Sequence, residues 1–243
     1  MKKWMFSHRW GLHGAVISGE KNTTLRIIPD KIVKACTPPD SPFDYPDHEL
    51  LVAASPVQVG DLVAVAEAYK DAIPPLDWAH HQLYKAGPGW TNKMYVRPEL
   101  MRYFLEVQKV EAFDFCGLPK EQMDAEGFQA FLRRARENPR LKRAVQGYAI
   151  AQRTFFQKTM DWDIWSDHHF VWRYTFIVRP RGICRVCGCS IGNPCFNPEH
   201  GYCWWEDETR TLCSHCAIPK IAEDPRTTHC VTWGRYNPTD KGL

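Results

Sequence analysis

The clearest chemistry in this chain lies in a cysteine-rich stretch near its carboxyl end. Seven of the ten cysteines fall between Cys184 and Cys216, and the outer four form two Cys-x-x-Cys pairs, Cys184 with Cys187 and Cys213 with Cys216. Each pair can present two thiolate sulfurs to one tetrahedral ion, with Zn–S bonds of about 2.3 Å. The chain shows no export signal, and in a reducing compartment a metal explains such a cluster better than disulfides do. The sequence therefore predicts a structural zinc ion held by these four outer cysteines.

Three further cysteines lie between the two pairs. Cys189, Cys195 and Cys203 remain, together with His200 or His215, and the interval between the pairs exceeds the roughly 15–20 residues usual in a zinc ribbon. A second zinc ion or an iron–sulfur cluster at these positions is an alternative that the sequence leaves open. A structural zinc is coordinatively full, so it holds a small module together and performs no hydrolysis.

Two adjacent tryptophans, Trp204 and Trp205, stand inside the cysteine-rich stretch. We expect them to pack in the small core of the module, since indole rings bury a large apolar area. Stacking on nucleic-acid bases is the alternative use of the same rings.

A second chemistry-bearing stretch is polar and lies near the amino end. Residues 17–29 read ISGEKNTTLRIIP, which puts Gly19, Lys21, Thr24 and Arg26 on a Gly-x-Lys-x-x-Thr-x-Arg spacing before an apolar pair. This spacing is typical of a site that binds or cleaves something polar. The alternative is a solvated turn in which both cations are surface charges and the threonine is a strand residue chosen for its β propensity.

A run of basic residues forms a third candidate site. It contains a single opposing charge, Glu137. The run suits contact with nucleic-acid phosphates, and a solvated helix face is the alternative. Its members are Arg133, Arg134, Arg136, Arg140, Lys142 and Arg143, of which Arg133, Arg134 and Arg140 are our chosen phosphate contacts.

Composition limits the classes of protein to consider. The 243 residues are 44% hydrophobic, enough for one large domain, or one domain with an appendage, around a packed core. A net charge of +3 is too mild to indicate nucleic-acid binding by itself, so such binding depends on a local patch. No stretch approaches the roughly 20 apolar residues of a membrane span, and the first residues lack the apolar run of a signal peptide. The sequence thus predicts a soluble, cytoplasmic protein.

The elements that must position these residues follow from apolar periodicity and turn residues. The amino half predicts alternating short elements, with Ser7 as the N-cap of the first helix and Gly19 as its stop. Proline and aspartate predict a loop over 36–49, and Gly60 and Asp61 a turn before an apolar strand that Glu67 follows. The expected elements are a strand over 2–6, a helix over 7–19, and strands over 23–28 and 62–66.

The remaining elements are predicted in the same way. Residues 71–93 show no clear periodicity and are expected to be irregular. A helix from about Pro119 is expected to carry Phe128, Phe131 and Leu132 inward. The other expected elements are a strand over 99–113, a helix over 140–159 and a closing strand over 170–180.

Together these blocks resemble an ASCH domain of the kind common in phage and prophage proteins. The order and spacing of the blocks carry the resemblance over about residues 3–180, rather than any single motif. The blocks are Phe6 and Ser7, Trp10, the Gly19-x-Lys21-x-x-Thr24-x-Arg26 motif, VGDLVAVAEAY and GWTNKMYVRPELMRYFLEVQKVEAFDFCGLPKEQMDAEGF. The resemblance implies an α+β fold, a PUA-like β-barrel with flanking helices, over residues 1–180. A zinc-binding module over 181–218 and an extension over 219–243 complete the expected organisation.

The resemblance also implies an activity. Small N4-acetylcytidine amidohydrolases in the wider family are proposed to use a lysine, a threonine and a glutamate, and Lys21, Thr24 and Glu67 match them in this sequence. A lysine with a lowered pKa can take the proton of the threonine hydroxyl, which then attacks an amide carbonyl. Arg26, with Gly19 beside it, can bind an oxyanion or phosphate, and Glu67 can protonate the leaving amine or accept its hydrogen bond.

Two function classes therefore stand at the level of sequence. One is a hydrolase that removes an acyl group from N4-acylated cytidine, with the zinc module positioning a larger substrate. The other is a non-catalytic module that binds RNA or single-stranded DNA. A metal-independent ribonuclease is a third reading, which the family suggests and no further residue supports.

Overall fold

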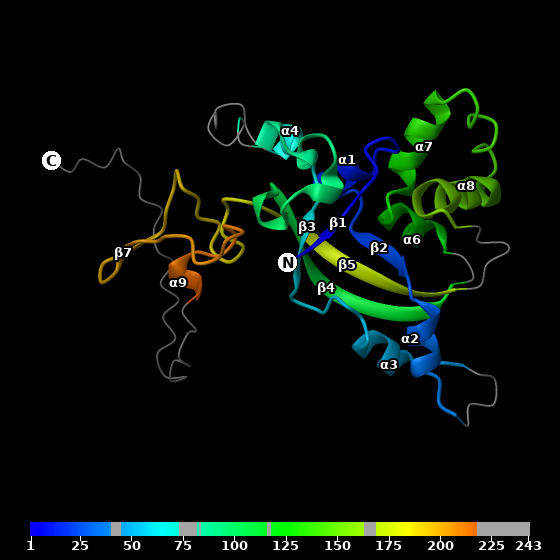
Figure 1. Ribbon diagram of the computed structural model, residues 1–243, viewed down its shortest axis with the longest axis horizontal. Helices are drawn as coiled ribbons and strands as arrows, with labels where there is room; N and C mark the ends of the chain where they lie inside the picture. The colour runs from blue at the N-terminus through cyan, green and yellow to red at the C-terminus, as the bar shows by residue number, and fades with distance from the viewer. Residues whose placement is uncertain (40–44, 73–81, 83, 116–117, 163–168, 218–243) are drawn as a thin grey trace. The chain divides into compact units, whose positions relative to one another are not determined.

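The computed structural model describes residues 1–39, 45–72, 82, 84–115, 118–162 and 169–217 (Figure 1). The chain divides into two compact units, Met1–Arg179 and Pro180–Leu243. The extension predicted over 219–243 lies outside the described residues, as do Cys116 and Cys230. No helix in the described part of the chain combines the length and the apolar character needed to cross a membrane.

The first unit is built on a five-stranded mixed sheet with the order β1-β3-β4-β5-β2. β1 pairs with β3 in parallel, and β3–β4 and β2–β5 pair antiparallel. The expected strands over 2–6, 23–28, 62–66, 99–113 and 170–180 are all present, with small shifts of their ends. Their bounds are β1 Lys2–Trp4, β2 Thr23–Ile27, β3 Leu62–Val65, β4 Tyr103–Asp114 and β5 Phe170–Pro180.

The expected closed barrel is wrong, because the strands form an open sheet. Closure requires backbone pairing between the edge strands β1 and β2, and β1 has only three residues, which pair with β3. Side chains bring the two edges together instead. The Trp4 ring lies 4.9 Å from the ring of Tyr174, and the Arg26 guanidinium carbon lies 5.4 Å from the Trp4 ring centre. The sheet is therefore curled, with an aromatic and cationic contact where a barrel would have hydrogen bonds.

Helices cover the sheet on two sides (Figure 1). The larger apolar cluster joins Leu25 and Val65 of the sheet to α1, α6, α7 and α8, and a second joins Val63 and Trp172 to α2 and α3. A third cluster, around Phe104, holds α4 and the turns that follow it. The bounds are α1 Leu12–Ile17, α2 Asp30–Ala35, α3 His48–Ala53, α4 Tyr69–Ala72, η1 Pro88–Trp90, η2 Lys93–Tyr95, η3 Pro98–Leu100, α6 Lys120–Ala125, α7 Phe128–Glu137 and α8 Tyr148–Met160.

The helix expected over 7–19 is shorter than predicted. It begins at Leu12 because Gly11 has a φ of 74°, a left-handed conformation that ends the preceding turn. Ser7 caps that turn, since its Oγ accepts a hydrogen bond from the Trp10 N–H at 3.3 Å, and Gly19 follows the helix as expected. Backbone conformation, rather than apolar spacing, sets the start of α1.

The helix expected from Pro119 is present but divided, and the next helix begins late. Gly127 has a φ of 84° and separates α6 from α7, while Phe128, Phe131 and Leu132 are buried as predicted. The helix expected over 140–159 begins at Tyr148, because turns occupy the preceding residues.

The described part of the second unit, residues 180–217, has little regular structure. A hairpin of β6 (Phe196–Asn197) and β7 (Gly201–Tyr202) and one helical turn, α9 (Ser214–Ala217), surround a small core. Asp207 organises the loop before α9: its Oδ1 accepts the backbone N–H groups of Thr211 and Leu212 at 2.8 and 3.0 Å. This loop delivers Cys213 to the core, which consists of cysteines with Trp205 packed against them.

Candidate metal centre and polar clusters

Two groups of four cysteine sulfurs form the core of the second unit. In each group every sulfur lies within 4.8 Å of the other three, and the groups share Cys189 and Cys213. No disulfide joins any cysteine that the structure describes. Such a set of sulfurs can hold a metal ion. The first group is Cys184, Cys187, Cys189 and Cys213, and the second is Cys189, Cys195, Cys203 and Cys213.

The sulfurs of the two groups differ in how readily they ionise without a metal. Burial favours the neutral thiol of Cys184 over its thiolate and so raises its pKa. Hydrogen bonds from the backbone N–H groups of Cys187, Cys213 and Val186 have the larger, opposite effect and lower the pKa of Cys184 to about 6. Burial and the neighbouring sulfurs raise the pKa of Cys189 and of Cys195. Adjacent thiolates repel one another, so a bound cation is what allows all of them to ionise together.

The four cysteines predicted as zinc ligands do not form one group of sulfurs in the structure. Three of them, Cys184, Cys187 and Cys213, lie together, and Cys189 is the fourth sulfur of their group. Cys216 packs against the same cluster but belongs to neither group. The Nδ1 atom of His215 lies 3.5 Å from the Cys195 sulfur. The three central cysteines, which the sequence leaves open as ligands of a second ion, are therefore part of one continuous cluster.

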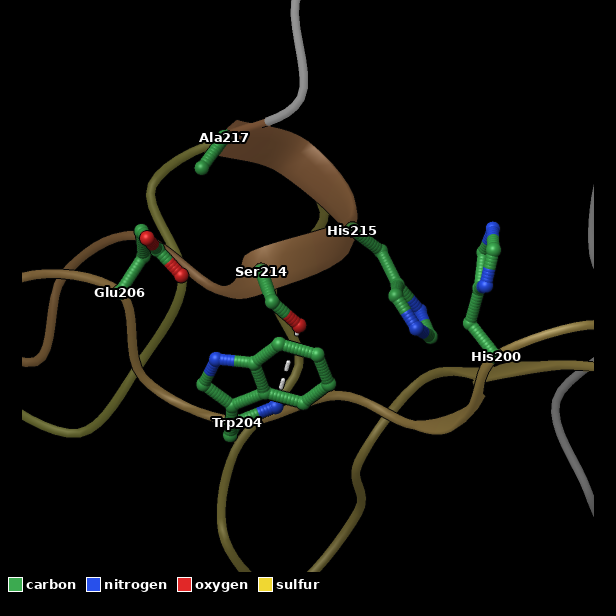
Figure 2. A pocket seen from close by; sticks show the side chains of 6 residues that line it. All are labelled: His200, Trp204, Glu206, Ser214, His215 and Ala217. Atoms are coloured by element: carbon green, nitrogen blue, oxygen red, sulfur yellow. Dashed lines mark hydrogen bonds between the residues drawn. The ribbon is translucent and has the colours of Figure 1, made fainter.

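A shallow pocket of about 310 Å³ lies beside this cluster. Figure 2 shows His200 and His215 on one side of the pocket and Glu206 on the other. Trp205 packs against the cysteines as expected, whereas Trp204 is 60% exposed and lines the pocket. One of the two tryptophans thus serves the core, and the other presents its ring to solvent.

In the first unit, Lys21 lies at the centre of a buried polar cluster. Its Nζ donates to the Glu126 carboxylate at 2.9 Å and to the Glu126 carbonyl at 2.8 Å, and both side chains are almost completely buried. Thr23 donates to the same carboxylate at 2.7 Å. Burial lowers the pKa of Lys21, although the neighbouring Glu126 opposes this shift. A Cβ on Gly127 would lie 3.2 Å from the Lys21 side chain, so the Glu126-Gly127 pair suits this position by both charge and size.

Thr24 and Arg26 lie on the other face of β2 from Thr23, since side chains alternate along a strand. Thr24 is buried and pairs in register with Tyr174. The Nε of Arg26 is buried without a hydrogen-bond partner among the described residues, and burial lowers the pKa of this guanidinium. Gly19 lies in the turn before β2.

Glu67 has a different set of partners. Its fully buried carboxylate accepts two hydrogen bonds from the half-exposed Arg102, and His13 Nε2 lies 3.4 Å away without hydrogen-bond geometry. Burial opposes ionisation, but His13 and Arg102 outweigh it and lower the pKa of Glu67. The His8 ring stacks on His13 with centroids 3.9 Å apart. The buried carboxylate thus lies next to one guanidinium and one imidazole, and the second imidazole stacks on the first.

The described contacts do not join Lys21, Thr24 and Glu67 to one another. Phe6 lies between Lys21 and a further lysine: its ring lies 5.8 Å from Lys21 Nζ, and its carbonyl accepts a hydrogen bond from Lys93. Burial lowers the pKa of Lys93, and the charge of Glu67 opposes this shift. The shared role of the lysine, the threonine and the glutamate remains a prediction.

The basic run lies at the end of α7 and in the turns that follow, with all six cationic side chains exposed. Arg133 pairs with Glu20, and Arg134 pairs with Glu137 at 3.3 Å. No ion pair in the described part of the chain involves the other four, which are Arg136, Arg140, Lys142 and Arg143.

Sequence reasoning missed the partners of both buried polar groups. Glu126 stands in the helix block of the ASCH resemblance, but its separation of 105 residues from Lys21 gave no local signal of contact. Arg102 and His13 were likewise not predicted beside Glu67. A buried charge requires a partner of opposite charge. A search of the sequence for an acidic residue to pair with Lys21 could therefore have drawn attention to Glu126.

These features define an α+β protein with a cysteine-rich unit that can hold a metal ion. No protein-family model matches the chain, and no curated protein matches it. Among solved structures it is similar to the crystal structure of a protein from Enterococcus faecalis V583 assigned to family DUF984, at 12% identity and a TM-score of 0.31 over 74% of this chain and 81% of that one.

Proposed function

We propose that the chain binds single-stranded nucleic acid, with RNA as the first ligand to test, and that zinc stabilises its cysteine-rich unit. The observation that carries the proposal is the exposed basic run at 133–143. Six cationic side chains in this run face solvent, and two of them have an acidic partner in the described structure, Glu20 for Arg133 and Glu137 for Arg134. The proposed phosphate contacts are Arg133, Arg134 and Arg140, extended by Arg136, Lys142 and Arg143.

The charge of this run suits a polyanion better than it suits the stability of the fold. Ion pairs between exposed side chains contribute about 0–1 kcal/mol, and four of these cations have no such pair in the described region. Phosphates of a single strand release condensed counterions when cations bind them, which makes affinity fall with salt. A local patch of this kind is what the mild net charge of +3 requires for nucleic-acid binding.

The test is fluorescence anisotropy of a labelled single-stranded RNA across a salt series. The double variant Arg136→Gln/Arg140→Gln should bind more weakly and reduce the slope of log K against log salt by about 1.4, since each phosphate contact contributes about 0.7. The matched control, Lys31→Gln/Lys34→Gln on α2, removes the same charge and should keep the slope. Equal slopes in all three proteins would remove the proposal, and DNA of the same sequence tests selectivity for RNA.

A second candidate is an amidohydrolase acting on N4-acylated cytidine, supported by the buried amine of Lys21 with its lowered pKa. In this reading Lys21, Thr24 and Glu67 are catalytic, and Arg26 and Gly19 bind substrate. Glu67, whose pKa is lowered by His13 and Arg102, accepts the hydrogen bond of the leaving amine rather than protonating it.

Turnover of N4-acetylcytidine tests this candidate directly. Lys21→Ala and Thr24→Ala should abolish turnover, while Thr37→Ala, whose hydroxyl bonds to the Val33 carbonyl at the end of α2, should retain it. No turnover by the unmodified chain, or equal turnover in the two threonine variants, would eliminate the candidate.

A further inference from the structure

We propose that the cysteine cluster is a two-metal centre in which two tetrahedral zinc ions share the thiolates of Cys189 and Cys213. This inference deepens the zinc site of the proposed function and is independent of nucleic-acid binding. It replaces the single ion on the outer four cysteines with six ligands, two of which bridge.

The first step is that the two groups of sulfurs share two members. Each group has the four donors that a tetrahedral ion requires, and Cys189 and Cys213 belong to both. Two tetrahedra with two common corners share an edge. Six sulfurs then satisfy two ions, with two terminal ligands on each side of the shared edge.

The second step is the spacing of the sulfurs. In a tetrahedral site with metal–sulfur bonds of about 2.3 Å, neighbouring sulfurs lie about 3.8 Å apart. The Cys213 sulfur lies 3.7 Å from that of Cys187 and 3.7 Å from that of Cys195. Cys187 belongs only to the first group and Cys195 only to the second. The Cys213 sulfur is therefore at the distance expected between two ligands of one ion in each of the two groups. Cys189 and Cys203 are 3.6 Å apart, which fits the second site in the same way.

The third step concerns the competing arrangement. Two separate tetrahedral ions require eight donors, and Cys216 and His215 are the seventh and eighth near the cluster. Cys216 lies outside both groups, and the Nε2 of His215 is buried without a partner among the described residues while its Nδ1 faces a single sulfur. The shared arrangement needs neither residue. Thiolate ligands select soft or borderline ions, of which zinc fits closed tetrahedral sites.

The decisive experiment uses the full chain with its metal exchanged for cadmium-113. We expect two cadmium ions per chain and two cadmium resonances with mutual scalar coupling, because the shared sulfurs connect the two nuclei. Two uncoupled resonances would show separate sites, and one ion per chain would show a single site. Either result overturns the proposal, as does iron with acid-labile sulfide in the protein as purified.

Variants provide a second measurement by metal content. Cys216→Ser and His215→Gln should each keep two zinc ions, whereas separate sites predict the loss of one. Cys203→Ser should lose one ion and Cys213→Ser both, and Cys36→Ala in the first unit controls for loss of a remote thiol. Replacement of a bridging cysteine can also unfold the unit. The metal content of Cys216→Ser and the cadmium–cadmium coupling in the unmodified chain therefore decide between shared and separate sites. Failure of RNA binding would leave both measurements unaffected.

Discussion

The cysteine-rich unit and the buried polar clusters of the first unit differ in how they compensate charges that are removed from water. Both bring charged groups out of water, which is costly unless the charges are compensated. In its described residues the cysteine-rich unit buries little apolar surface, since the core there consists of cysteines with Trp205 packed against them. The first unit places the Lys21–Glu126 pair among three apolar clusters that are already packed.

The comparison shows where the stability of each unit originates. In the cysteine-rich unit we propose that a metal ion bound by the cysteines holds the fold, because a domain of this size buries too little apolar area to be stable alone. In the first unit the fold holds the charges, because the attraction within a buried ion pair is largely offset by the cost of removing both charges from water. Loss of the metal and loss of a charge should therefore differ greatly in effect.

The largest effect is expected from chelation. Removing the metal should unfold residues 183–217 and leave Met1–Arg179 folded, because the metal-binding free energy of about 10–16 kcal/mol is also the folding free energy of such a unit. Hydrogen exchange followed by mass spectrometry reports the two segments separately. If residues 183–217 keep their protection from exchange after chelation, the metal is not what holds this unit folded.

The same contrast explains what could be predicted from the sequence. The seven clustered cysteines lie within one short stretch, so their spacing indicates a metal unit without knowledge of the fold. Strands such as β4 and β5 were also predictable, because their apolar alternation is local. Glu126 was not, since only the packing of α6 and α7 against β2 brings it to Lys21. The start of α1 was missed for a related reason: Gly11 adopts a backbone conformation that apolar periodicity does not encode.

The next largest effect is expected from breaking the buried ion pair. Glu126→Gln should lower the free energy of unfolding by about 3–5 kcal/mol, because it leaves the Lys21 amine buried without a counterion. Chemical denaturation measures the loss, with the exposed Glu137→Gln on α7 as control. Lys21→Met/Glu126→Met should recover part of it, since a buried pair is replaceable by apolar side chains. A single variant as stable as the control would contradict the role given to this pair.

A smaller, pH-dependent effect is expected at Glu67. Its folded-state pKa is lowered from the ordinary value of 4.5, so the carboxylate stabilises the fold above the unfolded-state pKa, and this contribution is lost as pH falls through the folded-state value. Glu67→Gln should cost about 1–3 kcal/mol near neutral pH, because the two hydrogen bonds from Arg102 lose their negatively charged acceptor and an amide N–H faces the guanidinium instead. The difference in unfolding free energy between the two proteins should stay constant above pH 4.5 and shrink below it. A constant difference down to strongly acidic pH would show that the charge of Glu67 is not what stabilises this cluster.

The smallest effect on stability is expected at the surface pair of Arg133 and Glu20. Arg133→Gln should change the free energy of unfolding by less than about 1 kcal/mol, because both side chains are exposed enough for water and salt to screen the pair. Its effect on RNA affinity should be the larger one, since removal of the Arg133 charge leaves the phosphate that it binds without its cation. Parallel denaturation and anisotropy measurements on Arg133→Gln and Glu20→Gln separate the two roles. Glu20→Gln frees the Arg133 guanidinium and should leave RNA binding unchanged or stronger. Weaker RNA binding in both variants would show that the Arg133–Glu20 pair supports the fold rather than contacting a phosphate.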